Sequence, residues 1–253
     1  MKKIVIANQK GGVGKTTTTI NLAYALAAKG KKILLLDLDP QGNTTSGLNI
    51  SAKDKITTYD ILINDEDINK SIIPCHQPGL SIIPANQNLS GARIEMVDLM
   101  AREYRLKNII EKISSHFDFI FIDTPPSLDL LTLNGLTAAD TVLIPIQCEY
   151  YALEGIAELL NTIKLVQKNL NRFLAIEGVL LTMYDSRTNL SKEVMESVVT
   201  HFREKTYKTI IPRNVKISEA PSHGLPISLY EPQSAGALAY EKTAEEFLKN
   251  NEY

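Results

Sequence analysis

One short stretch of this sequence combines the residue types that bind a polyphosphate. Residues 10–17 read Lys-Gly-Gly-Val-Gly-Lys-Thr-Thr, between an apolar run at 4–7 and a helical pattern at 19–26. Glycines let backbone N–H groups curl around phosphate oxygens, and the N-terminus of the following helix adds positive potential. Lys15 is expected to neutralise the β- and γ-phosphates, and the Thr16 hydroxyl to ligate Mg²⁺. The expected nucleotide-binding residues of this loop are Lys10, Gly11, Gly12, Val13, Gly14, Lys15, Thr16 and Thr17.

The loop departs from the general pattern G-x-x-x-x-G-K-[ST], because Gln9 stands at its first glycine position and a second lysine, Lys10, follows. A glycine-rich turn with two solvated lysines is the plain alternative, which the agreement of strand, glycines, Lys-Thr and helix disfavours. This deviant Walker A form resembles that of the ParA/MinD family of P-loop ATPases. Lys10 at the loop entrance can reach a nucleotide held by a facing subunit, where it would act as a catalytic cation in the manner of an arginine finger.

A second motif follows the apolar run 33–36, where residues 37–43 read Asp-Leu-Asp-Pro-Gln-Gly-Asn. A carboxylate just past a strand end can orient an attacking water or reach a metal-bound water. It can equally cap the turn that Pro-Gln-Gly makes, and the residues alone leave both readings open. The segment resembles the switch I motif of the family, which implies that Asp39 positions the catalytic water. For Asp37 a structural role remains open.

A third motif, Phe-Ile-Phe-Ile-Asp-Thr-Pro-Pro, occupies residues 119–126. An apolar strand that ends in aspartate is typical of a Walker B strand, whose carboxylate holds Mg²⁺, often through water. Asp123 is therefore expected to share the metal with Thr16. The Thr-Pro-Pro that follows cannot be regular strand or helix interior, and it resembles switch II of the family, which would sense the γ-phosphate.

A fourth candidate lies at residues 210–214, Ile-Ile-Pro-Arg-Asn. Proline offers an apolar face, arginine a planar one, and asparagine both a donor and an acceptor, which together suit an adenine ring. The residues alone favour a strand that ends in a proline turn. The resemblance to the family implies that Pro212, Arg213 and Asn214 contact the base.

These motifs, and Ser-Glu-Ala-Pro-Ser-His-Gly at 218–224, stand in the order found in ParA proteins of the Soj type, the chromosome or plasmid partitioning ATPases. The resemblance covers almost the whole chain. It implies a Mg²⁺-dependent ATPase with slow basal turnover that forms an ATP-dependent homodimer. It also implies nonspecific binding of double-stranded DNA and stimulation by a ParB-type centromere-binding protein. Because the first strand is expected near residue 3, the operator-reading N-terminal region of larger plasmid relatives is not expected.

Strand and helix patterns alternate along the chain, which predicts an α/β fold with a doubly wound, mostly parallel sheet flanked by helices. We expect one P-loop ATPase domain over residues 1–253, with residues 43–87 the least regular stretch. Strands are expected at 4–7, 33–36, 80–84, 119–122, 141–145, 176–182 and 209–211. Helices are expected at 19–26, 153–167, 191–202 and 236–250.

The net charge of −2 argues against a generally basic nucleic-acid binder, so that DNA binding requires a local patch. Residues 161–220 contain ten Lys and Arg against six Asp and Glu, a local charge of +4. An ordinary solvated helical surface could carry the same charge. The resemblance singles out Arg187 and Lys216 as DNA contacts, and a dimer would double their number.

Neither a signal peptide nor an apolar run near the roughly 20 residues of a membrane span is seen, which predicts a cytoplasmic protein. The resemblance to partitioning ATPases implies that it associates with the nucleoid. A MinD-like membrane switch is the main alternative, but it needs a basic amphipathic C-terminal helix. Residues 241–253 carry four acidic residues against two lysines, which disfavours membrane binding.

Two further classes of P-loop protein are disfavoured by the residues that they would need. An iron–sulfur reductase needs cluster ligands, whereas Cys75 and Cys148 stand far apart in sequence and form no CxxC pair. A metabolic ligase or kinase needs a separate acid–base constellation, and the four histidines, at 76, 116, 201 and 223, are scattered.

Overall fold

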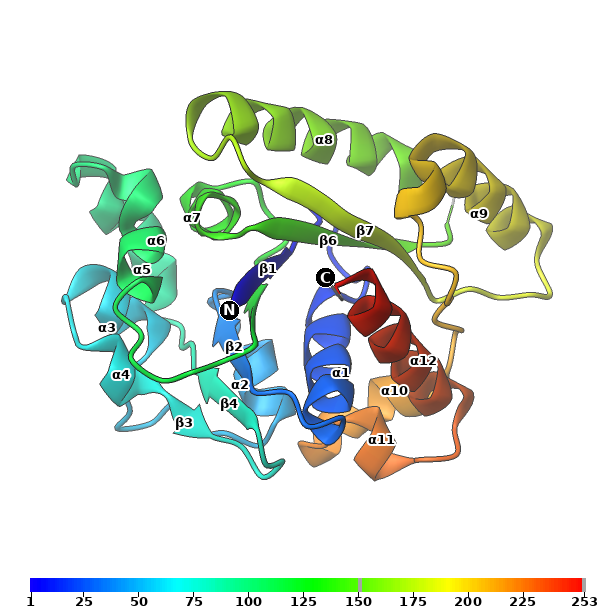
Figure 1. Cartoon of the computed structure of the whole chain (residues 1–253), viewed down its shortest axis with the longest axis horizontal. Coiled ribbons are helices and arrows are strands. Elements are labelled where there is room, and N and C mark those ends of the chain that lie inside the picture. Colours follow the sequence, from blue (N-terminus) through cyan, green and yellow to red (C-terminus); the bar gives the residue numbers. More distant parts are fainter. Residues whose placement is uncertain (150–151, 252–253) are drawn as a thin grey trace.

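A twisted sheet forms the centre of the protein (Figure 1). The computed structural model describes residues 1–149 and 152–251, and within them seven strands follow the spatial order β3-β4-β2-β5-β1-β6-β7. The short β3 pairs antiparallel with β4, whereas the other pairings of the described strands are parallel. The strands are β1 (Lys2–Ile6), β2 (Ile33–Asp37), β3 (Ile73–Pro74), β4 (Leu80–Ile83), β5 (Phe119–Asp123), β6 (Thr141–Gln147) and β7 (Ala175–Thr182).

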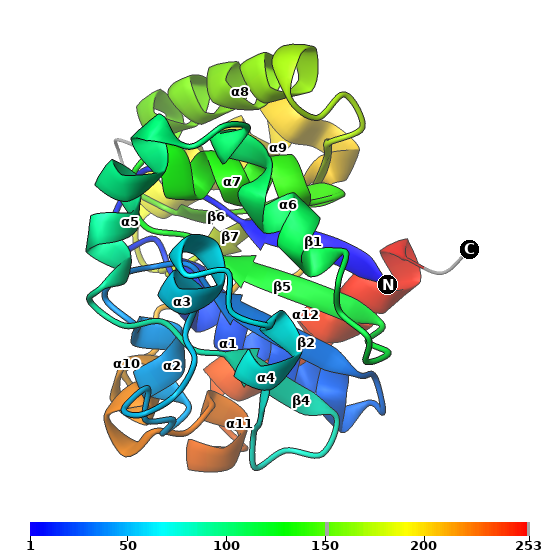
Figure 2. The ribbon, with the colours of Figure 1, turned by 90° about the vertical axis from the view of Figure 1, so that its left-hand side faces the viewer.

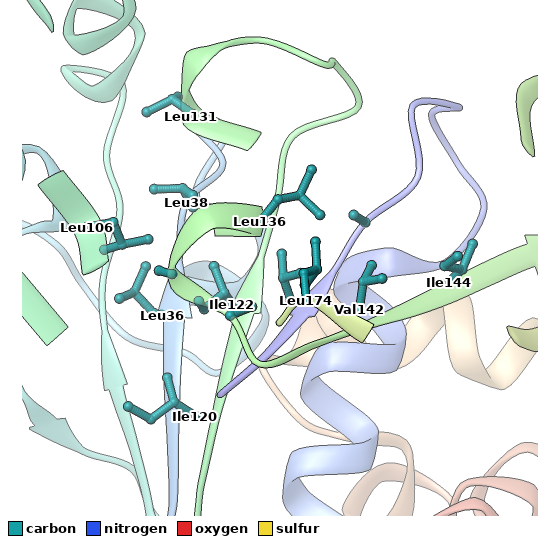
Figure 3. Packing of buried hydrophobic residues seen from close by; sticks show 14 of the residues in the cluster. Leu36, Leu38, Leu106, Ile120, Ile122, Leu131, Leu136, Val142, Ile144 and Leu174 are labelled. Atoms are coloured by element: carbon teal, nitrogen blue, oxygen red, sulfur yellow. The ribbon is translucent and has the colours of Figure 1, made fainter. Parts of the chain in front are cut away.

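Both faces of the sheet are covered, and the central parts of the strands are accordingly apolar. All five residues of β2 and all five of β5 are buried. Successive residues of β2 belong to opposite hydrophobic clusters, with Leu35 on one face and Leu36 on the other. Figure 3 shows Leu36, Ile120 and Ile122 packing beneath Leu136 in the first of these clusters.

The helices are divided between the two faces (Figures 1 and 2). Residues of α1 and α12 pack with Phe119 and Phe121 on one face, while residues of α5 to α9 pack with Ile120 and Ile122 on the other. The longer helices are α1 (Lys15–Ala28), α7 (Leu130–Ala138), α8 (Ala152–Asn169), α9 (Asn189–Phe202) and α12 (Ala235–Asn250). The shorter ones are α2 (Asn43–Gly47), α3 (Thr58–Ile63), α4 (Ile68–Ser71), α5 (Leu89–Glu95), α6 (Arg105–Ile110), α10 (Val215–Glu219) and α11 (Ile227–Tyr230).

The order of connections places a crevice at the end of β1. The chain leaves β1 through α1 on one face to reach β2, and leaves β5 through α7 on the other face to reach β6. Ligands of open α/β sheets bind where successive crossovers depart in opposite directions, beyond the carboxyl ends of the strands. The register brings three such ends together, because both Ile6 and Asp37 lie opposite Asp123.

Six of the seven expected strands are present with bounds within two residues of those expected, and the expected strand at 209–211 is wrong. That segment runs beside β7 but makes only isolated bridges, Val179 with Thr206 and Tyr184 with Pro212. The N–H groups of residues 208 and 209 donate to the carboxylate of Glu246 at 2.7 and 2.9 Å instead. Pro212 has no N–H to donate, so a continuous ladder cannot form.

The apolar face of α12 is part of the core. Ala237, Tyr240, Ala244 and Phe247 are buried against the sheet, so this face is not presented to a lipid surface. The last two residues of the acidic tail, 252–253, lie outside the described residues. Among the described residues, none of the helices combines the length and apolar character that a membrane crossing requires.

Phe247 should contribute much of the attachment of α12. Its ring lies 5.1 Å from that of Phe119 and 5.6 Å from that of Phe121, and it is fully buried. We expect Phe247→Ala to lower the free energy of unfolding by about 3–5 kcal/mol, because a cavity replaces the ring. Urea denaturation followed by circular dichroism measures the change. Lys249→Ala, two residues further along the same helix, should cost less than about 0.5 kcal/mol, and an equal loss in both variants would contradict this assignment.

Candidate functional site

The loop between β1 and α1 has the geometry of an anion site. Gly12 and Gly14 have φ angles of 74° and 89°, the left-handed region that favours glycine. No side-chain cap among the described residues satisfies the start of α1, so its first N–H groups are available to an anion. The loop lines a cavity of about 360 Å³. The cavity is lined by Gly11, Gly12, Gly14, Lys15, Thr16, Thr17, Asp39, Gln41, Asn43, Pro126 and Met183.

Val13 is 1% exposed, and the burial of its side chain in the core attaches the phosphate loop to the body of the protein. Its carbonyl accepts a hydrogen bond of 2.8 Å from the hydroxyl of Thr182 at the end of β7. The loop is thus attached to a strand from the opposite end of the chain, which the sequence pattern does not indicate.

The Lys15 ammonium is an almost buried cation at the floor of the cavity. The residue is 7% exposed, and its Nζ donates to the carbonyl of Lys10 at 3.2 Å. Burial lowers the pKa of Lys15, which the carboxylates of Asp123 and Asp39 partly oppose. A cation held in this way is matched to an anion with several charges, such as a polyphosphate.

Asp123 is fully buried and is surrounded by threonine hydroxyls. Its Oδ2 accepts hydrogen bonds of 2.7 Å from both Thr16 and Thr44, and its Oδ1 accepts one of 3.3 Å from Thr19. Burial raises the pKa of Asp123 to about 6 despite these donors and the nearby Lys15. Hard oxygen ligands of this kind suit Mg²⁺, so the donor set fits the metal expected between Thr16 and Asp123.

Asp37 has a structural role. Its Oδ2 accepts from the N–H and hydroxyl of Thr45 at 3.0 and 2.6 Å, and its Oδ1 from the N–H of Asp39 at 3.2 Å. These bonds fold the chain after β2 into α2. Burial, followed by the charge of Asp123, raises the pKa of Asp37 to about 7.

Asp39 lies at the cavity wall, where its Oδ1 accepts the N–H of Gln41 at 2.9 Å. It is 6% exposed, and it lines the cavity together with the residues of the phosphate loop. The Asp39 carboxylate thus closes a turn and also borders the space beside the loop.

A second cavity, of about 240 Å³, adjoins the first and shares Gly14, Thr17 and Met183 with it. Pro212, Arg213 and Asn214 line it, so the structure brings the segment expected at the base next to the phosphate loop. The Asn214 side chain also caps α10, accepting the N–H of Lys216 at 2.8 Å. The structure thus places the residues expected at the phosphates and those expected at the base around two adjoining cavities.

Three residues at or next to these cavities were not found from the sequence. Thr44 donates to Asp123, Tyr240 lines the second cavity from α12, and Met183 lines both cavities. Met183 has a φ angle of 52°, a left-handed conformation that costs energy in a residue with a side chain and often marks functional sites. Only the position of Thr44, shortly after the Asp-Pro-Gln-Gly turn, offered a signal in the sequence.

Lys10 points to the rim of the site. Its Nζ lies 3.9 Å from the Glu149 carboxylate, and both side chains are partly exposed, at 33% and 50%. Lys10 is not among the residues that line the two described cavities.

Arg187 and Lys216, the two residues expected to contact DNA, line neither cavity. Each belongs to a segment that also contributes to a cavity wall. Tyr184, three residues before Arg187, accepts the N–H of Arg213 at 2.9 Å. Lys216 follows Asn214 by two residues. Arg187 is 84% and Lys216 46% exposed at the side chain.

The two cysteines belong to opposite faces of the sheet, Cys148 to the cluster of α5 to α9 and Cys75 to the cluster of α1 and α12. Burial raises the pKa of both thiols to about 12. Among the described residues, no group of three or more His, Cys, Asp or Glu side chains could hold a metal ion on its own. The arrangement therefore offers no support for an iron–sulfur reductase.

The profile of a family described as an AAA domain matches residues 1–176. The sporulation initiation inhibitor protein Soj of Bacillus subtilis is 57% identical over 250 residues, which cover 98% of this chain and 99% of that protein. The chromosome-partitioning ATPase Soj of Treponema pallidum is 54% identical, with 98% and 97% covered. The chain belongs to the Soj/ParA family of chromosome-partitioning ATPases.

Solved structures agree on the fold of this Soj/ParA chain. A Mycobacterium smegmatis protein named cobyrinic acid a,c-diamide synthase, with a bound ATP analogue and magnesium, superposes with a TM-score of 0.86 at 36% identity, covering 98% of this chain and 95% of that one. The septum site-determining protein MinD of Pyrococcus horikoshii, complexed with Mg-ADP, gives 0.78 at 27% identity, covering 97% and 95%. MinD is thus a more distant relative than the Soj proteins. The expected α/β fold with a doubly wound, mostly parallel sheet is confirmed.

The two raised carboxyl pKa values predict an unusual pH dependence for the nucleotide-free protein. Asp37 and Asp123 hold protons when folded at pH values where the unfolded chain, with aspartate pKa near 3.9, has lost them. We therefore expect the free energy of unfolding to rise by roughly 2 kcal/mol as the pH falls from about 8 to about 5.5. Urea denaturation at several pH values measures this. Asp123→Asn should make the dependence shallower, and stability that falls over the same range would contradict the assignment.

Proposed function

We propose that this Soj/ParA chain is a Mg²⁺-dependent ATPase that hydrolyses ATP slowly and acts as a dimerisation switch in chromosome or plasmid partitioning. The observation that carries the proposal is the pairing of two adjoining cavities, one lined by the phosphate loop and the other by Pro212, Arg213 and Asn214. Nucleotides and magnesium bound to related structures support it.

Each residue of the site has a defined task in this scheme. The N–H groups of residues 11–17 and the Lys15 ammonium bind the phosphates, and Thr16 with Asp123 holds Mg²⁺. When bound, the metal neutralises charge on the β- and γ-phosphate oxygens. Asp39 orients the attacking water from the cavity wall, because it is the carboxylate that lines the cavity beside the loop. Pro212, Arg213 and Asn214, which line the second cavity, contact the adenine ring.

Dimerisation places Lys10 on the nucleotide of the facing subunit. The residue is partly exposed at the rim, and its own-chain partner, Glu149, lies at the long distance of 3.9 Å. A loose ion pair of this kind is worth less than about 1 kcal/mol, so it is easily exchanged for a phosphate oxygen across an interface.

The output of the switch is nonspecific binding of double-stranded DNA through Arg187 and Lys216, released when a ParB-type partner stimulates hydrolysis. A monomer offers few phosphate contacts and a dimer twice as many, which makes binding dependent on ATP. We place such a protein in the cytoplasm, associated with the nucleoid.

We expect salt-sensitive binding to a mixed-sequence DNA duplex with ATP, and at least tenfold weaker binding with ADP or without nucleotide. Fluorescence anisotropy across a salt series measures it, and the affinity should fall steeply because phosphate contacts release counterions. Arg187→Glu should abolish binding while dimerisation with ATP, followed by light scattering, remains.

Absence of binding under all three nucleotide conditions would contradict the DNA output but leave the ATPase site standing. Loss of both DNA binding and dimerisation in Arg187→Glu would show that the substitution disturbs the fold.

Lys10→Ala tests the contact across the dimer. We expect ATP binding to be retained, because Lys15 and the loop N–H groups are intact, while the ATP-dependent dimer and stimulated hydrolysis are lost. Sedimentation with ATP and a phosphate-release assay measure the two effects. Lys29→Ala, which removes a lysine at the far end of α1, is the control and should dimerise normally. Normal stimulated hydrolysis in Lys10→Ala would rule out the cross-subunit role.

A further inference from the structure

The two basic residues assigned to DNA are each paired with a carboxylate of their own chain. Arg187 pairs with Asp185, two residues earlier, and Lys216 pairs with Glu219, three residues later. Asp185 lies in the loop between β7 and α9, and Glu219 closes the short α10 (Figure 1). The same charge arrangement thus occurs in two unrelated local structures.

The Arg187 pair uses the edge of the guanidinium that suits a phosphate. Its Nε donates to Oδ1 of Asp185 at 2.8 Å, and its Nη2 donates to Oδ2 at 2.6 Å. This parallel two-bond geometry is the one in which arginine binds either a carboxylate or a phosphate. The carboxylate is held in place because Oδ1 also accepts the Arg187 N–H at 3.0 Å, and its side chain is only 16% exposed.

The Lys216 pair is held from several sides. Its Nζ donates to Oε2 of Glu219 at 2.8 Å, and the same oxygen accepts the Tyr230 hydroxyl at 3.0 Å. The ammonium also lies 5.7 Å from the centre of the Tyr230 ring, whose other contact is a stacked His223 at 4.8 Å. The carboxylate therefore stands where a phosphate oxygen would meet the lysine.

We propose that Asp185 and Glu219 occupy the phosphate positions of Arg187 and Lys216, compete with the DNA backbone for them, and thereby hold the DNA affinity of each subunit low. The proposal rests on the DNA-binding function proposed above. Both carboxylates would make way for phosphate when DNA binds, so each contact exchanges one anion for another.

The size of the effect suits a switch that must release DNA. An exposed ion pair stabilises a protein by about 0.2–1 kcal/mol, so breaking one costs up to about fivefold in affinity. Two such pairs in each subunit lower the DNA affinity of a monomer, whereas a dimer still has enough phosphate contacts to bind DNA. Release of DNA after hydrolysis then requires only that the two subunits separate, without a further change in the DNA-binding surface.

The wall of the base cavity lies between the two pairs. The N–H of Arg213 donates to the carbonyl of Tyr184, the residue before Asp185. The hydrogen bonds from Arg187 lower the pKa of Asp185, and the positive charge of Arg213 adds a smaller contribution. Asn214 accepts the N–H of Lys216. The residues that contact the base are therefore continuous with both carboxylate–cation pairs.

The test is a double-mutant cycle on DNA binding, with the full chain and saturating ATP. We expect Asp185→Asn to bind a mixed-sequence duplex about three- to fivefold more tightly than the unsubstituted protein. Asparagine can still accept the Arg187 N–H, so the loop keeps its turn. In an Arg187→Gln background the gain should vanish, because nothing is left to unmask. Glu219→Gln with Lys216→Gln forms the parallel cycle.

Glu193→Gln is the matched control, since Glu193 is exposed on α9 and has no ion pair within the described part of the chain. It changes the net charge equally and should alter affinity less than twofold. An Asp185→Asn protein that binds no tighter than the parent, or a gain that persists without Arg187, would overturn the competition while leaving DNA binding itself intact. If neither the parent nor the variants bind DNA with ATP, the proposed DNA output is wrong and the inference is wrong with it.

Discussion

Two buried carboxylates, Asp37 and Asp123, end neighbouring strands at the same edge of the sheet, opposite one another in register. Burying two anions side by side is costly unless donors and cations surround them. Thr45 and backbone N–H groups satisfy Asp37, while threonine hydroxyls and Lys15 surround Asp123. The raised pKa values show that this compensation is incomplete. A divalent cation would complete it, so the electrostatics of the core and the chemistry of the site have the same origin.

The division of labour between the two carboxylates follows from their partners. Asp37 directs both oxygens inward, to Thr45 and Asp39, and so shapes the turn that carries Asp39 to the cavity wall. Asp123 accepts from hydroxyls that are themselves able to contact a metal. Two neighbouring strands thus end in the same residue type, but the two aspartates differ in purpose. Asp37 is structural and Asp123 is chemical, because only Asp123 faces the phosphate loop.

A single segment connects the nucleotide site to the outer surface. Residues 212–216 pass from the base cavity to α10, and Met183 and Tyr184 bring the end of β7 against them. Every cation that acts outward in the proposed function, Lys10, Arg187 and Lys216, faces a carboxylate of its own chain. Such pairs are weak in water and are replaced at little cost by phosphate, which suits reversible contacts with a second subunit or with DNA.

The sequence by itself predicted six strands of the described sheet, and the structure brings most of the predicted site residues to two adjoining cavities. Continuous apolar runs that end in aspartate or in a glycine loop indicate buried parallel strands with polar residues at their carboxyl ends. This pattern can be recognised without tertiary information. The same pattern did not predict the short segments correctly. Residues 209–211 read as a strand, yet Glu246 accepts the N–H groups of residues 208 and 209, and Pro212 has no N–H.

The sequence could not place Thr44, Met183 or Tyr240, because their roles depend on contacts between elements far apart in the chain. The pairing of Arg187 and Lys216 with Asp185 and Glu219 was likewise decided in three dimensions. Sequence spacing puts opposite charges near one another, but only the folded loop and helix determine whether they meet.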